Sequence, residues 1–492
     1  MRRQLLFGLA LLLFNCQPVS EKITQPEHPL AAKIDSIVIA QKATFELPGL
    51  AVGVIQDGEV IYAKGHGVQA LDTKAPLDLQ SIFHMASVSK PVVATAIVQL
   101  VEAGKIDLEE RLVTYLPYFT MADERYKDIT IQQMLVHTSG IPDVEDYEWE
   151  NPQLDDGAAE RYSKSFGDMQ LDFEPGSDFS YSNAAFNLLA DVIAKTSGIL
   201  FEDYMKANIF EPAGMKNTTF FKPEVPEAIA TKAHILGPDL QLKVWEHYPY
   251  NRIHAPSSTL NSNIEDLLQW AKLNLNKGTI NGKEVYSQKA YQMLTTGQYP
   301  IGEQDSVCLS WFTKKVDGQK LLGHSGGDEG FRTYFGFIPS TQSAVVLMGN
   351  GDTFWNDYLV NALLQRLEGV KPWKQPISFD LKNLILTEGI DAVKAYYFDK
   401  KENAADQYLF RTGFLDDLGY KCIDRGHYQE ALDIFLFMVE LEPEHSGWPD
   451  SVADAYRAMG EQEKAIEWYQ KALTIDPDQG FSQRKLQELL GS

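Results

Sequence analysis

The C-terminal part of this chain repeats itself with a period of 34 residues. Matching residue types recur at this spacing: Gly426 with Gly460, Ala431 with Ala465, Phe435 with Tyr469, and Pro443 with Pro477. A fixed period of this length predicts stacked helix-turn-helix units, because one unit alone cannot bury its apolar face. About three units make a stable stack. We therefore expect residues 381–408 to add a degenerate helical pair, or the array to pack on the rest of the chain.

The spacing and residue types resemble the tetratricopeptide repeat, and Leu418-Gly419 and Tyr456 stand at its signature positions. The resemblance implies an all-α tail over residues 376–492. Repeat arrays present concave surfaces to extended peptides, so a protein partner is a candidate ligand of this tail. Residues 369–376 hold two prolines and few core residues, and they mark the expected boundary.

The remaining residues must form a second folded unit, because hydrophobic cores stop growing near about 250 to 300 residues and the chain has 492. With 44% hydrophobic and 23% charged residues, the composition is that of a globular protein. The net charge of −24 would repel a phosphate backbone, which argues against a nucleic-acid partner. The ten histidines and three cysteines show no zinc-ligand spacing, and no metal or cofactor is expected.

The N-terminus has the pattern of an export signal. Arg2 and Arg3 precede an apolar run over residues 5–14, which is too short to span a membrane. Cys16 follows in a context that resembles a bacterial lipobox, although Asn15 replaces the usual small residue. We expect residues 1–16 to be a signal peptide with Cys16 as the lipid attachment site, and residues 17–29 to be a tether. The alternative is a plain signal peptide with a chance cysteine. Either way the protein is expected to be exported to the periplasm or cell surface, with any membrane contact made through the lipid.

Residues 30–370 carry β-patterns at both ends and helical patterns between them. Residues 50–56 and 59–68 flank Asp57-Gly58, a hairpin-type turn. Near the other end, residues 321–327, 331–338 and 344–350 read as a three-stranded meander. Residues 88–103 and 184–196 are the clearest helical patterns, each followed by a glycine. This order predicts an α+β fold in which helices flank an antiparallel sheet and form a helical insert.

A Ser-x-x-Lys tetrad, Ser87 to Lys90, stands at the start of the first of these helices. One helical turn separates Ser87 from Lys90, so the ammonium can reach the hydroxyl and activate it as a nucleophile. The pattern alone is weak, because Ser482 and Lys485 form a second match in the repeat tail, where we assign it no function. An isolated tetrad is more often a capping serine with a solvated lysine.

Two later motifs reverse that weighting. Tyr181-Ser182-Asn183 begins a helical pattern, and Gly323-His324-Ser325-Gly326-Gly327 falls on an expected strand. Ser-x-x-Lys, Tyr-x-Asn and Lys/His-x-Gly in this order resemble the penicillin-recognising serine enzymes. The resemblance covers residues 30–367 and is to the class C β-lactamase-related family, with its carboxypeptidase, D-aminopeptidase and esterase members. It implies a β-lactamase/transpeptidase-like fold.

The resemblance also implies a role for each motif residue. Ser87 would attack a carbonyl and form an acyl-enzyme. Lys90 and Tyr181 would share the proton transfer, with the ammonium lowering the pKa of the Tyr181 phenol. The others are the substrate-binding and oxyanion residues: Asn183, His324, Gly326 and Gly327. The backbone N–H groups of Gly327 and of the nucleophile Ser87 would hold the oxyanion.

His324 stands where β-lactamases of this class usually carry lysine. Because a histidine is only partly charged near its usual pKa, the substitution favours a D-stereospecific peptidase, carboxypeptidase or esterase over an efficient β-lactamase. A weak β-lactamase, or a largely non-catalytic binding protein whose repeats recruit a partner, remain the alternatives. Arg332 is either a compensating cation or a solvated strand residue. His84 and His137 are expected to be structural, and Cys308 and Cys422 to be unpaired thiols.

Overall fold

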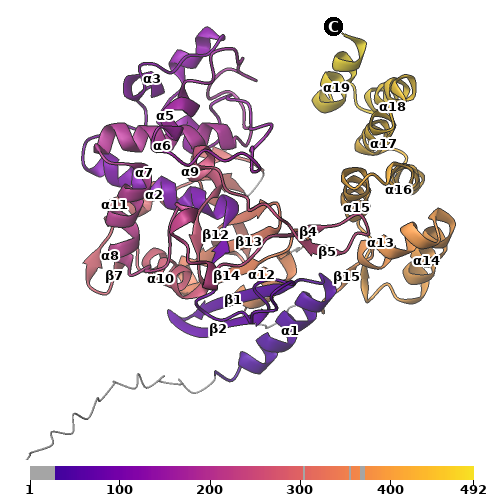
Figure 1. The fold of residues 1–492 in the computed structure, drawn as a ribbon, viewed down its shortest axis with the longest axis horizontal. Coiled ribbons are helices and arrows are strands. Elements are labelled where there is room, and N and C mark those ends of the chain that lie inside the picture. Colours follow the sequence, from indigo (N-terminus) through magenta and orange to yellow (C-terminus); the bar gives the residue numbers. More distant parts are fainter. Residues whose placement is uncertain (1–27, 303–304, 354–355, 366–371, 492) are drawn as a thin grey trace, which may run out of the picture.

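The computed structural model describes residues 28–302, 305–353, 356–365 and 372–491 (Figure 1). The expected signal peptide, Cys16 and nearly all of the expected tether lie outside the described residues. The first part of the expected boundary segment, up to residue 371, also lies outside them.

The main sheet, within the described residues, has eight strands in the order β2-β1-β14-β13-β12-β11-β10-β9, all antiparallel to their neighbours. The strands are β1 (Gly49–Gln56), β2 (Glu59–Gly67), β9 (Tyr299–Pro300), β10 (Ser306–Val307), β11 (Phe312–Val316), β12 (Gln319–Asp328), β13 (Phe331–Ile338) and β14 (Ser343–Gly349). The expected hairpin and meander form, and β1 pairs with β14, which joins the two ends of the domain. The predicted antiparallel α+β fold is confirmed.

Strand β1 is buried along its whole length because both faces of the sheet are covered. Leu50, Val52 and Val54 point to one face, where they pack in a core with helices α1 (Ala31–Thr44) and α12 (Asp357–Leu364). Ala51 points to the other face and joins the larger core. This alternation follows from the two-residue period of a strand, so the domain has three layers.

The helical insert lies between β2 and β9, and its helices form the left-hand part of Figure 1, above and beside the sheet. Its helices are α2 (Ser89–Glu102), α3 (Leu112–Tyr115), α4 (Ile131–Leu135), α5 (Ala158–Ser163), α6 (Asn183–Ser197), α7 (Phe201–Met205), α8 (Glu211–Ala213), α9 (Ala255–Ser258), α10 (Ile264–Leu275) and α11 (Gln288–Thr295). Short strand pairs occur as well: β3 (Phe83–His84) with β6 (Asn261–Ser262), β4 (His234–Leu236) with β5 (Leu242–Val244), and β7 (Thr279–Ile280) with β8 (Lys283–Glu284). Helix α2 is buried on almost every side, so it forms the centre of the domain.

The tail is a stack of helices, as its period predicted. They are α13 (Ser378–Thr387), α14 (Ile390–Asn403), α15 (Thr412–Asp424), α16 (Tyr428–Leu441), α17 (Gly447–Ala458), α18 (Gln462–Ile475) and α19 (Gly480–Leu490). A short pair, β15 (Gln375–Pro376) and β16 (Tyr408–Leu409), closes the first turn of the stack. Gly426 and Gly460 occupy equivalent turns with φ near +82° and +79°, a conformation that other residues adopt at a cost. Helices α13 and α14 take the place of the expected degenerate pair.

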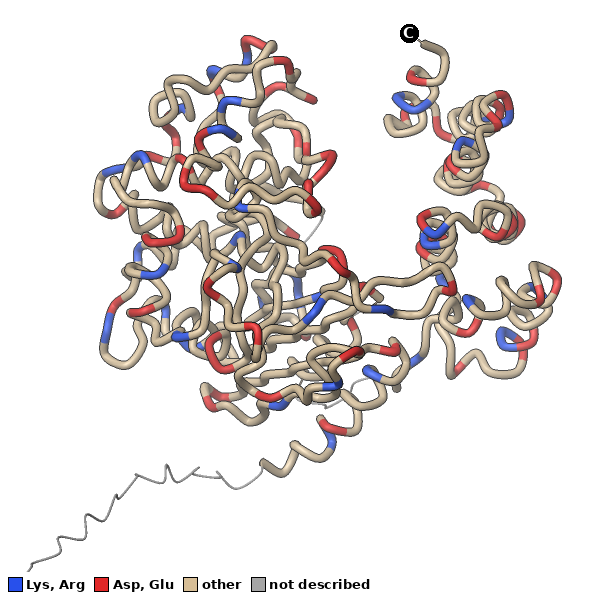
Figure 2. The backbone as a smooth tube through the Cα atoms, in the orientation of Figure 1, with Lys and Arg blue, Asp and Glu red and all other residues tan. Residues whose placement is uncertain are grey.

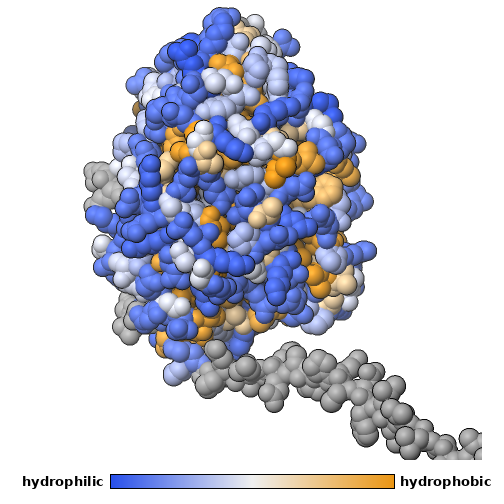
Figure 3. Space-filling view, turned by 90° about the vertical axis from the view of Figure 1, so that its left-hand side faces the viewer, coloured by the Kyte–Doolittle hydropathy of each residue, from blue (hydrophilic) through white to orange (hydrophobic). Residues whose placement is uncertain are grey.

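Acidic residues occur along the backbone of both the sheet-and-helix domain and the tail (Figure 2). On the face shown in Figure 3, apolar residues form small patches among hydrophilic ones. Among the described residues no single helix is long and apolar enough to cross a membrane, although the bent pair Asn183–Ser197 and Phe201–Ala213 together reaches that length and composition.

Candidate active site

Ser87 lies in a single 3-10 turn, Ala86–Val88, that leads directly into helix α2. The preceding residue, Ala86, has a φ of +48°. A left-handed conformation costs a residue with a Cβ roughly 1–2 kcal/mol, and such strain collects where a side chain must be presented in one direction. The turn therefore holds Ser87, which remains partly exposed, at the N-terminal end of a buried helix.

Strand β12 crosses directly against this turn. A Cβ added to Gly326 would lie 2.3 Å from the carbonyl oxygen of Met85 and 2.3 Å from Oγ1 of Thr333. Thr333 itself donates a hydrogen bond of 2.7 Å to that Met85 oxygen. The third motif therefore needs glycine at 326, because the backbone of β12 approaches the backbone just before Ser87 closely there.

Lys90 is fully buried, yet its ammonium is held by three acceptors. Its Nζ donates to Oγ of Ser87 at 3.1 Å, to Oδ1 of Asn183 at 2.6 Å and to the carbonyl oxygen of Ser257 at 2.8 Å. Three donors and three acceptors satisfy the group, as a buried cation requires. The structure thus brings the serine and lysine of the first motif and the asparagine of the second to one point.

Burial lowers the pKa of Lys90 to about 7, because desolvation disfavours the charged ammonium. The carboxylates of Asp328 and Asp143 act in the opposite direction and raise it. At neutral pH the amine is therefore poised between its two protonation states, which is the condition for a general base.

Tyr181 corrects a prediction. We expected a neighbouring ammonium to lower the pKa of the phenol, but burial raises this pKa well above its usual value. A hydrogen bond with Ser87 lowers it by less, and the charges of Asp143 and Asp328 raise it again. Lys90 Nζ lies 4.9 Å from the centre of the Tyr181 ring, near its face. The phenol consequently stays protonated at neutral pH, so of the two residues expected to share the proton transfer, only Lys90 has a pKa near neutrality.

Asn183 is the first residue of α6, and Ser182 caps that helix by accepting from the N–H of Ala185. Asp143 holds the asparagine from the other side, accepting its backbone N–H at 2.6 Å and its side-chain N–H at 3.1 Å. The amide oxygen is thereby turned toward Lys90. Sequence reasoning missed Asp143, since a single aspartate after Ile141-Pro142 has no distinguishing pattern.

His324 is buried and neutral. Its Nδ1 donates to the carbonyl oxygen of Ser325 at 2.6 Å, because that oxygen can only accept. Burial, aided by the charge of Lys90, lowers its pKa to about 3. Its Nε2 is therefore a bare acceptor, and it has no hydrogen-bond partner among the described residues. The prediction of a partly cationic His324 is therefore wrong.

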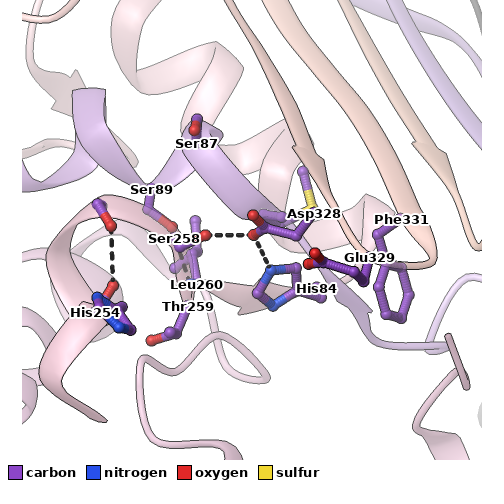
Figure 4. A network of polar contacts seen from close by, with 12 residues as sticks. His84, Ser87, Ser89, His254, Ser258, Thr259, Leu260, Asp328, Glu329 and Phe331 are labelled. Carbon is purple, nitrogen blue, oxygen red and sulfur yellow. Dashed lines mark hydrogen bonds and ion pairs between the residues drawn. The ribbon is translucent and has the colours of Figure 1, made fainter. Parts of the chain in front are cut away.

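Asp328 was also missed, because it lies one residue beyond the third motif. Its carboxylate accepts from Nε2 of His84 at 2.6 Å and from the hydroxyl of Ser258. Figure 4 shows Asp328 between these two side chains. Ser258 follows Ser257, whose carbonyl oxygen holds Lys90. The carboxylate thus fixes the α9 segment that supports the lysine.

His137, Arg332 and the two cysteines contact neighbouring parts of the fold, and among the described residues none of them hydrogen-bonds to Lys90. His137 accepts the N–H of Ser182 at its Nδ1 and stacks on Tyr181, with ring centres 4.2 Å apart. Arg332 donates to the carbonyl oxygens of Asp328 and Phe331, so it braces the turn at the end of β12. In the described part of the chain, Cys308 and Cys422 are buried free thiols, as expected.

A pocket of about 450 Å³ adjoins Asp143, the residue that holds Asn183, although Ser87, Lys90 and His324 are not among its lining residues. Its lining includes Asp143, Glu145, Asp146, Glu148, Tyr162 and His254. A volume of this order accommodates a small organic ligand.

Comparison with known proteins supports the division into a sheet-and-helix domain and a repeat tail. A profile described as Beta-lactamase matches residues 34–369, and one described as TPR repeat matches residues 453–479. Penicillin-binding protein 4 of Amycolatopsis lactamdurans is 27% identical over 68% of this chain and 89% of its own length. Protein flp of Staphylococcus aureus is 26% identical over 67% of this chain, which covers 65% of the length of that relative.

Solved structures show the same fold. The octameric penicillin-binding protein homologue from Pyrococcus abyssi aligns with a TM-score of 0.62 and 25% identity, over 70% of this chain and 78% of its own. A penicillin-binding protein from Bacillus halodurans aligns with a TM-score of 0.57 and 24% identity, over 67% of this chain and 98% of its own. The profile match covers more than half of the 492 residues, and the chain belongs to the β-lactamase family, with a tetratricopeptide repeat in its helical tail.

Proposed function

We propose that this protein is a serine hydrolase that forms an acyl-enzyme through Ser87 on an ester or amide substrate. One observation carries the proposal: the buried Nζ of Lys90, with a pKa of about 7, donates to Oγ of Ser87 at 3.1 Å. A buried amine that titrates near neutral pH, in contact with a hydroxyl, is the arrangement of an activated nucleophile.

In this mechanism neutral Lys90 removes the proton from Oγ of Ser87 as the oxygen attacks the substrate carbonyl. The backbone N–H groups of Ser87 and Gly327 receive the developing oxyanion, and one such donor contributes about 3–4 kcal/mol of barrier lowering. The lysine then carries the extra proton. Tyr181, which stays protonated, relays a proton to the leaving group and recovers one from Lys90. Water hydrolyses the acyl-enzyme by the reverse proton path.

His324 selects the substrate class. The neutral imidazole of His324 lacks the positive charge with which a lysine at this position would attract a carboxylate. We therefore propose an esterase or a D-stereospecific peptidase acting on substrates with no carboxylate at this wall. Carboxypeptidase and β-lactamase activities, whose substrates carry a carboxylate, rank below it. The relationship to Penicillin-binding protein 4 supports testing penicillin as a slow acylating ligand.

Two active-site probes test the nucleophile. Intact protein is incubated with a fluorophosphonate and with a fluorescent penicillin, and labelling is located by peptide mass spectrometry. We expect label on Ser87 and none on Ser87→Ala. Ser482→Ala is the matched control, since it removes the serine of the other Ser-x-x-Lys tetrad and should label like wild type. Equal labelling of wild type and Ser87→Ala would defeat the proposal.

A non-catalytic role is the second candidate, and the tetratricopeptide match at residues 453–479 favours a protein partner for the tail. An activity screen distinguishes the enzyme from the binding protein. The substrates are neutral short-chain esters, D-amino-acid amides and a chromogenic cephalosporin. Turnover of any of these that is lost in Ser87→Ala supports the enzyme. No turnover of any of them, together with a partner bound by the tail, supports the binding protein.

We also propose that the protein is exported and anchored through a lipid on Cys16. The residues 1–16 that carry this proposal have a signal-peptide pattern ending in a cysteine. Mass spectrometry of the membrane fraction checks it, and an unmodified N-terminus there would contradict the anchor.

A further inference from the structure

A hairpin of the catalytic domain reaches into the helical tail. Strands β4 and β5 pair between His234 and Val244, and Figure 1 shows them extending from the sheet domain to the helices α13 and α15. At the tip, Leu236 and Leu240 are 4% and 0% exposed and belong to the core of the tail, with Leu415, Leu418 and Ile377. The hairpin is therefore fixed by the tail rather than by its own domain alone.

Two tail residues hold the backbone of the hairpin tip. Nε of Arg425 donates to the carbonyl oxygen of Leu236, and Nε2 of His427 donates to that of Pro238. Both donors lie in the turn between α15 and α16. A third bond joins the side-chain amides of Gln241 and Asn383 at 3.2 Å.

The base of the hairpin touches the turn that follows the third motif. Gly330 has a φ of +81°, and a Cβ there would lie 2.5 Å from Cβ of Ala233 and 2.6 Å from the backbone nitrogen of His234. The His234 N–H donates to the Gly330 carbonyl oxygen. No side chain fits between the hairpin and the turn, so a displacement of one must displace the other.

His234 clamps the hairpin base at three further points. Its Nδ1 donates to the carbonyl oxygen of Asn350 at 2.7 Å, and its Nε2 accepts the N–H of Leu71 at 3.1 Å. Its own carbonyl oxygen accepts the N–H of Asp352. The base is thus joined to the end of β14 as well as to the turn at Gly330.

The turn that Gly330 shares also carries Asp328 and Glu329. Asp328 binds Ser258 and His84, and the neighbouring Ser257 carbonyl oxygen holds Nζ of Lys90 at 2.8 Å. Glu329 accepts from Nε1 of Trp149 at 2.8 Å, in the loop that contains Asp143 through Glu148. A continuous series of short contacts therefore connects the tail to the support of the lysine.

We propose that the helical tail positions the active site, with Arg425 and His427 as positioning residues that act through the 234–244 hairpin on Asp328 and hence on Lys90. The inference rests on the proposed function for its kinetic consequence. Its structural part, the link from the tail to the turn at Asp328, does not depend on any substrate.

The experiment compares full-length variants by pre-steady-state acylation and by hydrogen exchange. Arg425→Ala with His427→Ala removes both donors to the hairpin tip. We expect the acylation rate constant to fall by about 10-fold while the substrate concentration at half-saturation stays within about twofold, because a misplaced base slows chemistry without removing binding contacts. The single variant Arg425→Lys keeps a hydrogen-bond donor at this position, so its acylation rate constant should stay close to that of wild type.

Arg457→Ala is the matched control, since Arg457 lies on α17 and pairs with Glu488 rather than with the hairpin. It should leave both constants unchanged. Hydrogen exchange of the peptide spanning residues 326–332 should accelerate in the double variant but not in this control. If the double variant unfolds, Arg425→Ala alone provides the same two measurements with a smaller change.

The outcomes separate the two proposals. Wild-type acylation at Ser87 with equal rates and equal exchange in the double variant overturns the positioning role and leaves the proposed function standing. Absence of acylation at Ser87 in wild type overturns the proposed function, and the exchange measurement then decides the link from the tail to the turn.

Discussion

The Nζ of Lys90 donates a hydrogen bond of 3.1 Å to Oγ of Ser87, although the lysine side chain is completely buried. Burial raises the free energy of the charged ammonium because it removes hydrating water. The hydrogen bonds to Asn183 and Ser257 offset only part of this desolvation penalty. The consequence is an amine whose pKa falls to about 7 beside the hydroxyl that it contacts.

The first prediction concerns the pH dependence of acylation. Only the neutral form of Lys90 can accept the Ser87 proton, so the rate should rise as pH increases through the pKa near 7 and then level off. The measurement is the single-turnover acylation rate between pH 5 and about 9.

Variants of the two nearby carboxylates check that assignment. Asp143 and Asp328 raise the pKa of Lys90. Asp143→Asn and Asp328→Asn should therefore each move the midpoint of the pH profile of acylation to lower pH. Asp155→Asn is the control, because its carboxylate pairs with exposed Arg161. A midpoint that stays in place in both test variants would show that another group controls the rate.

The second prediction concerns Gly326→Ala. The new methyl group would meet the Met85 carbonyl oxygen at 2.3 Å, and that oxygen belongs to the backbone just before Ser87. Strand and turn must separate, which should cost about 1–3 kcal/mol of the free energy of unfolding and abolish most acylation. Denaturant unfolding and probe labelling measure the two effects.

Gly167→Ala is the control for that variant, since a Cβ at 167 meets nothing within 4 Å. It should behave like wild type in both assays. Full labelling of Gly326→Ala would mean that the approach of β12 to the Ser87 turn is not required.

The third prediction concerns His324→Lys. A charged ammonium at this wall can bind a substrate carboxylate, whereas the neutral imidazole cannot, and one charge-assisted hydrogen bond is worth about 1.5–3 kcal/mol. We expect the ratio of penicillin to neutral-ester acylation to rise by about 10-fold. His324→Gln keeps a neutral polar group and should leave the ratio near that of wild type. An unchanged ratio in His324→Lys would remove the histidine from the explanation of substrate choice.

The fourth prediction concerns the second Ser-x-x-Lys tetrad. The Ser482 hydroxyl donates to Oδ1 of Asp450 at 2.5 Å, and Lys485 pairs with Asp450 and Asp454 at 2.7 and 2.6 Å. These bonds fasten α19 to α17. Ser482→Ala should therefore lower the stability of the tail by about 1–3 kcal/mol and leave the acylation rate unchanged.

Limited proteolysis near residue 480 measures that loss, with Glu467→Ala, an exposed position on α18, as the control. Cleavage at the wild-type rate in Ser482→Ala would show that the bond to Asp450 contributes nothing to the tail.

The sequence by itself determined the architecture. Alternating apolar residues indicated strands with one buried face, because successive side chains of a strand point to opposite faces. Continuous apolar runs indicated strands buried on both faces. The 34-residue period fixed the tail, because helical units of that length must stack. The three motifs also predicted which side chains would meet at Lys90, since spacing along a helix decides what Ser87 and Lys90 can touch.

Only the tertiary structure decided the chemistry of those side chains. The pKa values of Lys90, Tyr181 and His324 depend on burial and on charges from distant parts of the chain, so sequence reasoning expected a lowered pKa for Tyr181 and a partly charged His324, and both expectations were wrong. Asp143 and Asp328 have no local pattern, and they became visible only through their bonds to Asn183, His84 and Ser258. The contacts of the 234–244 hairpin could not be predicted from the sequence either. They join it to Arg425 and Gly330, about a hundred or more positions away, and no local periodicity reflects such contacts.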